Sequence, residues 1–200
     1  RTKKSDFRNL WKQKDSDIKR VIWAPHHSIN GSDTLSYSTF LQVAHQMLEL
    51  CRNYNGKVQF VFKPHPALKT KLYALEGWGQ EITDKYYALW ADMPNSSMVE
   101  GDYVELFQTS DAMIHDCSSF TVEYLYVNKP VMYLSKPNHL DVSNELGRLC
   151  YNKHYHGETI EEVKDFLENV VIAGSDDMKD QRGVFVHDHL TSKGGTVAEN

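Results

Sequence analysis

Short apolar runs alternate with segments of helical periodicity along most of this 200-residue sequence. Residues 58–62 form the strongest run, and Pro64 and Pro66 forbid its continuation as a strand. Strands that alternate with helices form parallel sheets with right-handed crossovers. We therefore predict an α/β fold in which a Rossmann-like parallel sheet is flanked by helices. The predicted strands are 21–24, 58–62, 111–114 and 131–134, and the predicted helices are 38–52, two within 67–95, 118–127 and 158–171.

The sequence divides into a polar leader and one domain. Residues 1–19 are charged with scattered apolar side chains, which is typical of a linker or connecting helix, and residues 20–200 hold the predicted strands. The first twenty residues carry eight Lys or Arg and three Asp, whereas the whole chain has a net charge of −5. The acidic remainder argues against nucleic-acid binding. The basic leader could contact an anionic membrane surface or acidic polymer, although a solvated linker is the simpler interpretation.

Cysteine content and hydropathy predict a cytoplasmic protein. The three cysteines are an odd number at unrelated spacings, which favours reduced thiols over a disulfide framework. No apolar run approaches the ~20 residues that span a bilayer, so any membrane contact is expected to be peripheral, at the inner face. The chain begins at Arg1 without methionine, and we expect it to be part of a longer protein.

Three predicted strands end in unusual polar sequences. In parallel α/β sheets, ligands bind beyond the carboxyl ends of the strands. Polar residues that follow three such strands should therefore converge, and together they indicate a site more strongly than any one of them alone. The three sequences are Pro25-His26-His27-Ser28, Lys63-Pro64-His65-Pro66 and His115-Asp116-Cys117-Ser118-Ser119.

Ser118 and Ser119 lie where a helix is predicted to begin. Hydroxyls and free backbone N–H groups would face one spot there, and the helix dipole would add roughly half a positive charge. Glu123, one turn further on, could accept hydrogen bonds from ribose hydroxyls. This arrangement predicts an anion site, but simple N-capping by serine would explain the same residues without a ligand.

Lys63 and His65 place a cation and an imidazole on a loop stiffened by two prolines. Both side chains can pair with a diphosphate, and His65 could donate a proton to a leaving phosphate. A turn with solvent-facing side chains remains the alternative. No Walker GxxxxGK[ST] and no GxGxxG sequence is present, so ordinary P-loop and dinucleotide sites lack their fingerprint.

The histidines do not predict a metal centre. His26 and His27 are a candidate pair, but adjacent residues rarely hold one ion without further ligands, and no HExxH or CxxC sequence supplies them. We therefore predict no metal and no cofactor. His115 is expected to be a loop residue. We expect the other histidines that lie in polar stretches, namely His154, His156, His187 and His189, to be at the surface.

Two long, ordered motifs resemble the CDP-glycerol:poly(glycerophosphate) glycerophosphotransferases of teichoic-acid and capsule synthesis. The first is Phe62-Lys63-Pro64-His65-Pro66, which matches the family's KPHP sequence. The second begins about forty-five residues later at Ser110 and continues through Ser118-Ser119 to Pro130-Val131. The resemblance covers roughly residues 20–135. This sequence has Cys117 where the family usually has tyrosine and Glu123 where it usually has aspartate.

The resemblance implies a GT-B enzyme, in which two Rossmann-like lobes enclose the active site. This chain would be the carboxyl-terminal, nucleotide-binding lobe that holds the CDP part of the donor. His65 would act in catalysis or contact the diphosphate. An amino-terminal lobe, absent here, would carry the histidine that activates the acceptor, so the chain alone is expected to be inactive. The residues expected to bind substrate are Lys63, His27, Ser28, Asp116, Ser118, Ser119 and Glu123.

The implied function is transfer of glycerol phosphate, or a related polyol phosphate, from CDP-glycerol to a polymer or glycolipid acceptor. Two alternatives remain open at this stage. Another GT-B enzyme, such as a sugar-nucleotide glycosyltransferase or a UDP-sugar 2-epimerase, would share the fold and the phosphate site. A non-catalytic module that binds an anionic polymer would instead rely on the basic leader.

Overall fold

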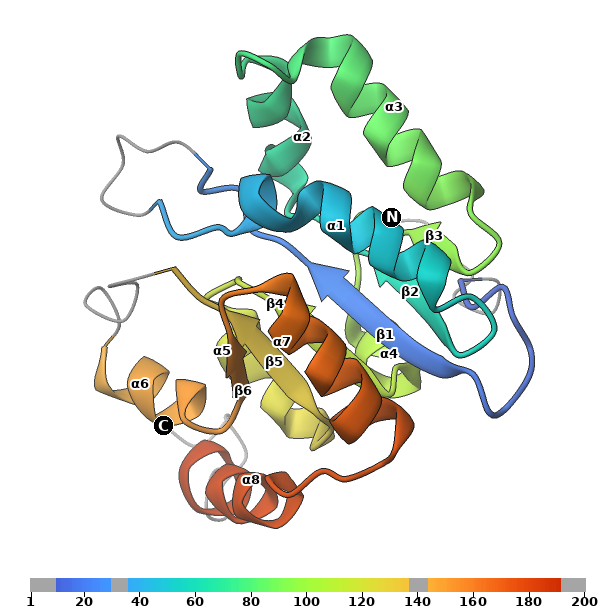
Figure 1. Ribbon diagram of the computed structural model, residues 1–200. Coiled ribbons are helices and arrows are strands. Elements are labelled where there is room, and N and C mark those ends of the chain that lie inside the picture. Colours follow the sequence, from blue (N-terminus) through green and yellow to red (C-terminus); the bar gives the residue numbers. More distant parts are fainter. Residues whose placement is uncertain (1–9, 30–35, 137–143, 192–200) are drawn as a thin grey trace.

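The computed structural model describes residues 10–29, 36–136 and 144–191, and it contains a six-stranded sheet (Figure 1). Every neighbouring pair of strands is parallel, in the order β3-β2-β1-β4-β5-β6. This confirms the predicted α/β class and the parallel sheet. The strands are β1 (Lys19–Ala24), β2 (Val58–Phe62), β3 (Ser96–Met98), β4 (Ala112–His115), β5 (Val131–Leu134) and β6 (Tyr155–Gly157).

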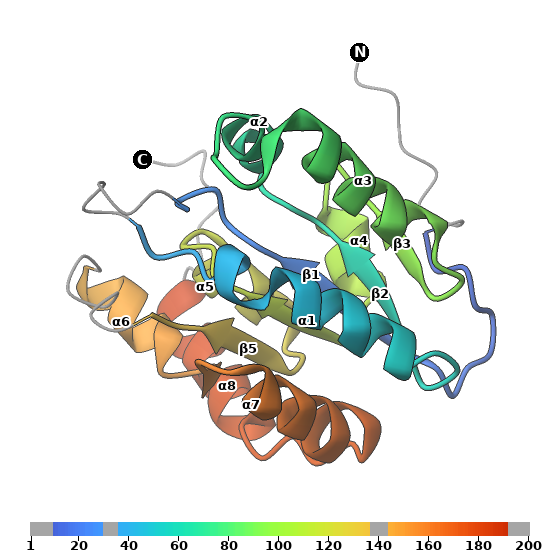
Figure 2. The ribbon, with the colours of Figure 1, turned by 45° about the horizontal axis from the view of Figure 1, so that its top comes forward.

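Helices cover both faces of the sheet and make three layers (Figures 1 and 2). One face is packed by α1, α2, α3 and α7, and the other by α4, α5, α6 and α8. The bounds are α1 (Phe40–Asn53), α2 (Pro66–Tyr73), α3 (Gly79–Asp92), α4 (Val104–Thr109), α5 (Phe120–Glu123), α6 (Glu145–Tyr151), α7 (Ile160–Asp165) and α8 (Lys179–Phe185). A 3₁₀ turn over Tyr124–Val127 follows α5, and π-helical turns over Phe166–Ile172 and Val186–Leu190 extend α7 and α8.

A hydrophobic core lies on each face of the sheet, and successive side chains of the central strands point alternately into one core and the other. In β1, Val21 and Trp23 face the α1 side, whereas Ile22 and Ala24 face the α4 side. All four side chains are at most 1% exposed. Strands buried on both faces read as continuous apolar runs rather than as alternating patterns. This is why β1, β2, β4 and β5 are visible in the sequence.

The described part of the leader corrects one expectation. Residues 10–18 form no helix but lie against the domain. Trp11 is 5% exposed in the α4-side core, and its indole Nε1–H donates to Thr109 Oγ1 at 3.0 Å. The Lys12 ammonium donates to the carbonyl of Met93 at 2.9 Å. Residues 10–18 therefore pack against the domain, and of the two predicted alternatives, linker or connecting helix, no helix forms in this stretch.

Two other findings concern helices and thiols. Residues 118–127 were expected to form one helix, but α5 has four residues and passes into the 3₁₀ turn. Cys51, Cys117 and Cys150 are all buried and free, as predicted. Across the described ranges, none of the helices has the length and apolar character needed to cross a bilayer.

Candidate nucleotide-diphosphate site

The site lies at the point where the strand order of the sheet reverses. The chain passes from β1 outward to β2 and β3 on one side, then returns to β4 on the other side of β1. β1 and β4 are hydrogen-bonded neighbours, with Ala24 opposite His115. The carboxyl ends of strands that flank such a reversal diverge into a crevice, which is where α/β sheets bind ligands. The sequences after β1, β2 and β4 meet at this edge, so their predicted convergence is confirmed.

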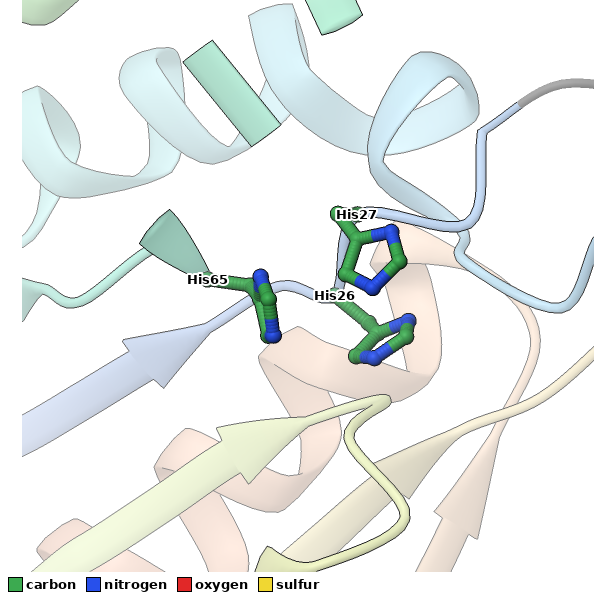
Figure 3. A group of neighbouring side chains, drawn as sticks. All are labelled: His26, His27 and His65. Atoms are coloured by element: carbon green, nitrogen blue, oxygen red, sulfur yellow. The ribbon is translucent and has the colours of Figure 1, made fainter. Parts of the chain in front are cut away.

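Three histidines from two strand ends form a compact cluster (Figure 3). The ring centroids of His26 and His27 are 4.1 Å apart, those of His27 and His65 are 4.2 Å apart, and those of His26 and His65 are 4.9 Å apart. One nitrogen from each ring lies within 4.8 Å of the others. The cluster forms because Pro25 and Pro64 end adjacent strands and turn both loops over the same edge; the backbone N–H of His65 donates to the carbonyl of Pro25.

All three rings favour the neutral form. Burial lowers the pKa of His26 to about 3, with further lowering from His27, His65 and Lys71. Burial is also the largest cause of the lowered pKa of His27, followed by Lys71. The pKa of His65 is lowered by burial and then by His27, Lys63 and Lys71. The three rings are therefore uncharged at neutral pH, and a bound anion would favour their protonated form.

The backbone fixes the tautomer of His65. This residue is the N-cap of α2, and its Nδ1 accepts a hydrogen bond from the backbone N–H of Ala67 at 3.1 Å. A neutral imidazole whose Nδ1 accepts must carry its proton on Nε2. His65 therefore offers an Nε2–H donor from a helix start that Pro66 makes rigid. An Nε2–H group of this kind can donate a hydrogen bond to a phosphate oxygen.

Asp116 has a different role from the one expected. It is 1% exposed, and its Oδ1 accepts the backbone N–H of His26. Its Oδ2 accepts from the N–H and hydroxyl of Thr39 and from the hydroxyl of Ser38. Burial raises the pKa of Asp116, and these hydrogen bonds oppose the rise. The carboxylate thus binds protein rather than ligand, and it occupies the start of α1, where many nucleotide-binding folds hold a phosphate.

Asp116→Asn is expected to lower the free energy of unfolding by about 1–3 kcal/mol. The amide has one acceptor oxygen where the carboxylate has two, so donors from His26 or from Thr39 lose their partner. Denaturant unfolding measures the change. Asp177→Asn is a matched control, because Asp177 is exposed, and it should change stability by less than about 0.5 kcal/mol. Equal effects of the two substitutions would contradict the role of Asp116.

The serines separate into a structural residue and two accessible ones. Ser28 is 4% exposed; its hydroxyl lies 3.0 Å from His26 Nδ1 and accepts the backbone N–H of Ser38. Ser118 and Ser119 are exposed, and Ser119 makes no side-chain capping bond to α5. Plain N-capping therefore does not account for Ser119. A helix of four residues has little macrodipole, so any anion would be held by hydroxyls and N–H groups rather than by a helix field.

Lys63 is turned away from the histidines, toward α4 and α5. Its side chain is buried, and Nζ donates to the carbonyl of Gly101 at 3.2 Å. Nζ also lies 5.1 Å from the centroid of the Tyr103 ring and 5.7 Å from that of Phe120. Burial lowers the pKa of Lys63. A hydrogen bond with Glu123 raises the pKa of Tyr103 to about 12, so Glu123 belongs to this second group beside the α5 start.

Three residues were missed or misplaced by the sequence analysis. Tyr37 stacks on His26 with centroids 4.9 Å apart, and a hydrogen bond with Ser118 opposes the burial that raises the pKa of its hydroxyl. It links the histidine cluster to the serines, and no motif marked it. His115 lies in β4 and is fully buried, and His154 is 2% exposed, so neither is the loop or surface residue expected.

A groove opens at the same edge of the sheet, beyond β5 and β6. Its volume is about 330 Å³, and it lies between the exposed side of α1 and the start of α7. Such a volume is at the lower end of the range for small-molecule sites. Its lining residues include Gln42, Gln46, Ser135, Lys136, Glu158 and Glu161.

Comparisons with known proteins agree with this geometry. The family model of CDP-Glycerol:Poly(glycerophosphate) glycerophosphotransferase matches residues 6–200. A search of the curated proteins finds no match.

Solved structures share the fold at low identity. A histidine variant of the wall teichoic acid polymerase TagF superposes with a TM-score of 0.53 at 18% identity, over 84% of this chain and 39% of that one. UDP-GlcNAc 2-epimerase from Neisseria meningitidis, bound to UDP-GlcNAc, gives a TM-score of 0.51 at 13% identity, over 86% of this chain and 44% of that one. The chain thus spans less than half the length of these proteins. They are GT-B enzymes, and the chain has the Rossmann-like architecture of one GT-B lobe.

Proposed function

The chain belongs to the CDP-glycerol:poly(glycerophosphate) glycerophosphotransferase family, and on that premise we propose that it is the donor-binding lobe of such a transferase. The proposed donor is CDP-glycerol or a related CDP-linked polyol phosphate. The proposed acceptor is a hydroxyl of a polymer or glycolipid, presented by an amino-terminal lobe. The observation that carries the proposal is the cluster at the strand-order reversal, where the His65 donor and the exposed Ser118 and Ser119 share one edge.

The proposed reaction is an in-line displacement at phosphorus. The acceptor hydroxyl attacks the β-phosphorus of the donor, a new P–O bond forms, and the bond from that phosphorus to the bridging oxygen breaks so that CMP leaves. His65 Nε2–H donates to a diphosphate oxygen. The Nε2–H hydrogen bond stabilises the negative charge that develops on the departing CMP, which leaves as an anion, and the proton of the acceptor hydroxyl passes to a base of the amino-terminal lobe.

The nucleoside half of the donor has a candidate position in the groove beyond β5 and β6. Gln42 and Gln46 offer amide groups on one wall, and Glu158 and Glu161 offer carboxylates on the other. The groove and the histidine cluster both lie at the carboxyl edge of the parallel sheet, where α/β sheets bind their ligands.

Calorimetric titration with CDP, CDP-glycerol, CMP and UDP tests the donor proposal. We expect CDP and CDP-glycerol to bind more tightly than UDP. Ser119→Ala should weaken CDP binding by at least tenfold, a loss of about 1.4 kcal/mol. Ser175→Ala replaces another exposed serine, far along the chain from the site, and should leave the affinity unchanged. In the full-length enzyme, His65→Ala should lower kcat by about 100-fold.

Other outcomes of the same titration would favour other functions. Preference for UDP over CDP would indicate a sugar-nucleotide enzyme, the second candidate, which the shared fold with UDP-GlcNAc 2-epimerase favours. Binding of an anionic polymer that falls steeply with salt and survives Ser119→Ala would indicate a non-catalytic polymer-binding module. Full activity of His65→Ala in the intact enzyme would overturn the proposed role of that residue.

A further inference from the structure

The fold brings a third histidine, His65, to the adjacent pair His26 and His27, and three histidines can form a metal site. His26 and His27 are adjacent in the chain, and two adjacent histidines alone make a poor centre. The loop after β2 brings His65 against both of them, so that one nitrogen of each ring lies within 4.8 Å of the others (Figure 3). Within the described ranges, this is the one group of three or more His, Cys, Asp or Glu residues whose ligand atoms converge in this way.

We propose that His26, His27 and His65 form a three-histidine site for a divalent transition metal of the Zn²⁺ type. Imidazole nitrogen is a preferred ligand of Zn²⁺, and three protein ligands leave a fourth position for water or a phosphate oxygen. Zn–N bonds of about 2.0–2.1 Å place tetrahedral ligand nitrogens roughly 3.4 Å apart. Modest side-chain rotations would close the cluster to that spacing.

The state of His27 supports a ligand at this position. Its Nδ1 is buried and has no hydrogen-bond partner among the described residues. Buried polar atoms are rarely left unpaired, and an unfilled ion or water site is one of the recognised reasons. Neither neighbouring ring is hydrogen-bonded to this atom, and their own Nδ1 atoms are engaged elsewhere, that of His26 with Ser28 and that of His65 with Ala67.

Metal binding and the donor role of His65 exclude one another. If a metal binds Nε2 of His65, the ring proton moves to Nδ1. If the metal binds Nδ1 instead, the Nδ1 lone pair forms the metal bond. In either case, the hydrogen bond that Nδ1 accepts from the Ala67 N–H is lost. The metal-bound ring also has no Nε2–H to offer a phosphate oxygen. The site therefore has two alternative states, metal-bound and donor-ready.

Titration of the untagged 200-residue chain with Zn²⁺ tests the site. We expect saturable binding of one ion and a rise in the midpoint of thermal unfolding with Zn²⁺ concentration. His27→Asn is the main variant, because the buried Nδ1 that it removes has no partner to lose. Loss of an outer-shell partner alone costs about 10–100-fold in metal affinity, so His27→Asn and His65→Asn should each weaken binding more than about 100-fold.

His45→Asn is the matched control, because His45 is exposed on α1, outside the cluster. The Zn²⁺ affinity of this variant should equal that of the unchanged chain. The amide signal of Ala67 should shift on saturation in nuclear magnetic resonance spectra, since its acceptor is lost. Absence of saturable binding at millimolar Zn²⁺, or equal affinity in His27→Asn and the unchanged chain, would overturn the proposal. The titration contains no nucleotide, so its result is independent of the donor proposal.

Discussion

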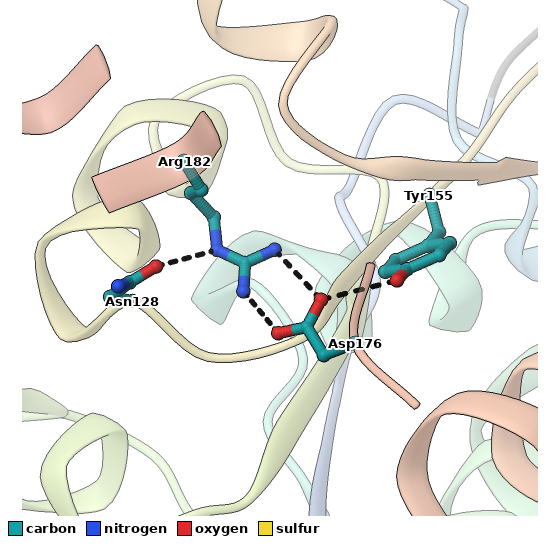
Figure 4. A network of polar contacts seen from close by, with 4 residues as sticks. All are labelled: Asn128, Tyr155, Asp176 and Arg182. Atoms are coloured by element: carbon teal, nitrogen blue, oxygen red, sulfur yellow. Dashed lines mark hydrogen bonds and ion pairs between the residues drawn. The ribbon is translucent and has the colours of Figure 1, made fainter. Parts of the chain in front are cut away.

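Replacement of Arg182 by alanine is expected to lower the free energy of unfolding by about 3–5 kcal/mol. The Arg182 side chain in α8 is fully buried, and its guanidinium forms an ion pair with Asp176 (Figure 4). Its Nε–H donates to Asn128 Oδ1 at 3.2 Å, and Tyr155 donates to Asp176 Oδ1 at 3.1 Å. The substitution leaves the Asp176 carboxylate, itself only 10% exposed, without its counter-ion.

Two companion variants separate the buried ion pair from a general effect of removing a cation. Lys164→Ala breaks an exposed pair with Glu161, whose side chains are 48% and 73% exposed, and it should cost less than about 0.5 kcal/mol. Arg182→Met combined with Asp176→Leu should recover much of the stability, because apolar side chains often replace a buried ion pair without net cost. Denaturant unfolding measures all three. A loss below about 1 kcal/mol for Arg182→Ala would show that the network contributes little.

The network also explains a part of the fold that the sequence pattern did not reveal. From residue 173 onward the chain has few apolar residues, so α8 carries no clear helical stripe. It is held by polar contacts that reach back to Asn128, at a distance of 54 residues along the sequence. Asn128 has a φ of 48°, a left-handed conformation that places its side chain beside Gly183. Contacts of this kind depend on the folded backbone and leave no periodic signal.

The strands that the sequence predicts differ from those it does not in whether both of their faces are buried. β1 and β2 are buried on both faces, so each reads as a short apolar run, and the prolines that follow them favour a strand over a helix. β3 and β6 have three residues each, Ser96–Met98 and Tyr155–Gly157, and they lie at the edges of the sheet. Their sequences lack an apolar pattern, and they become strands through pairing with β2 and β5.

The candidate site shows the same division. A parallel sheet brings its strand ends to one edge, so the positions of His26, His65 and Ser118 could be predicted from the strands alone. The direction of each side chain depends on packing that the sequence does not display. Lys63 points toward Tyr103 and Phe120, and the carboxylate of Asp116 caps the start of α1. Tyr37 reaches the cluster from a loop whose approach is set by the tertiary fold.

Acid is expected to destabilise the chain because two histidines are buried in neutral form. His115 and His154 lie with ring centroids 5.3 Å apart, and neither Nε2 has a hydrogen-bond partner among the described residues. Burial lowers the pKa of His115 to about 3 and lowers the pKa of His154 well below its ordinary value, with His115 as the next cause for His154.

The sign of the effect follows from these directions. Both histidines have a lower pKa in the folded chain than the value of about 6.5 expected when it is unfolded. At pH values above about 6.5, the contribution of these two histidines to the free energy of unfolding does not change with pH. Below that pH, the unfolded chain takes up protons that the folded chain excludes, so stability falls as pH falls toward 3. At pH 5 His115 should remove about 2 kcal/mol, and His154 should add a loss of the same sign.

Denaturant unfolding at pH 7.5 and pH 5.0, with and without His115→Leu and His154→Leu, isolates this contribution. Asp116 acts in the opposite direction, because its pKa is raised by burial, and His26 acts in the same direction; both are present in every variant and cancel in the comparison. We expect the double variant to lose at least about 2 kcal/mol less stability between the two pH values than the unchanged chain. His45→Leu, at an exposed position, should leave the loss unchanged. An equal loss in the double variant and the unchanged chain would mean that these two rings do not titrate with unfolding.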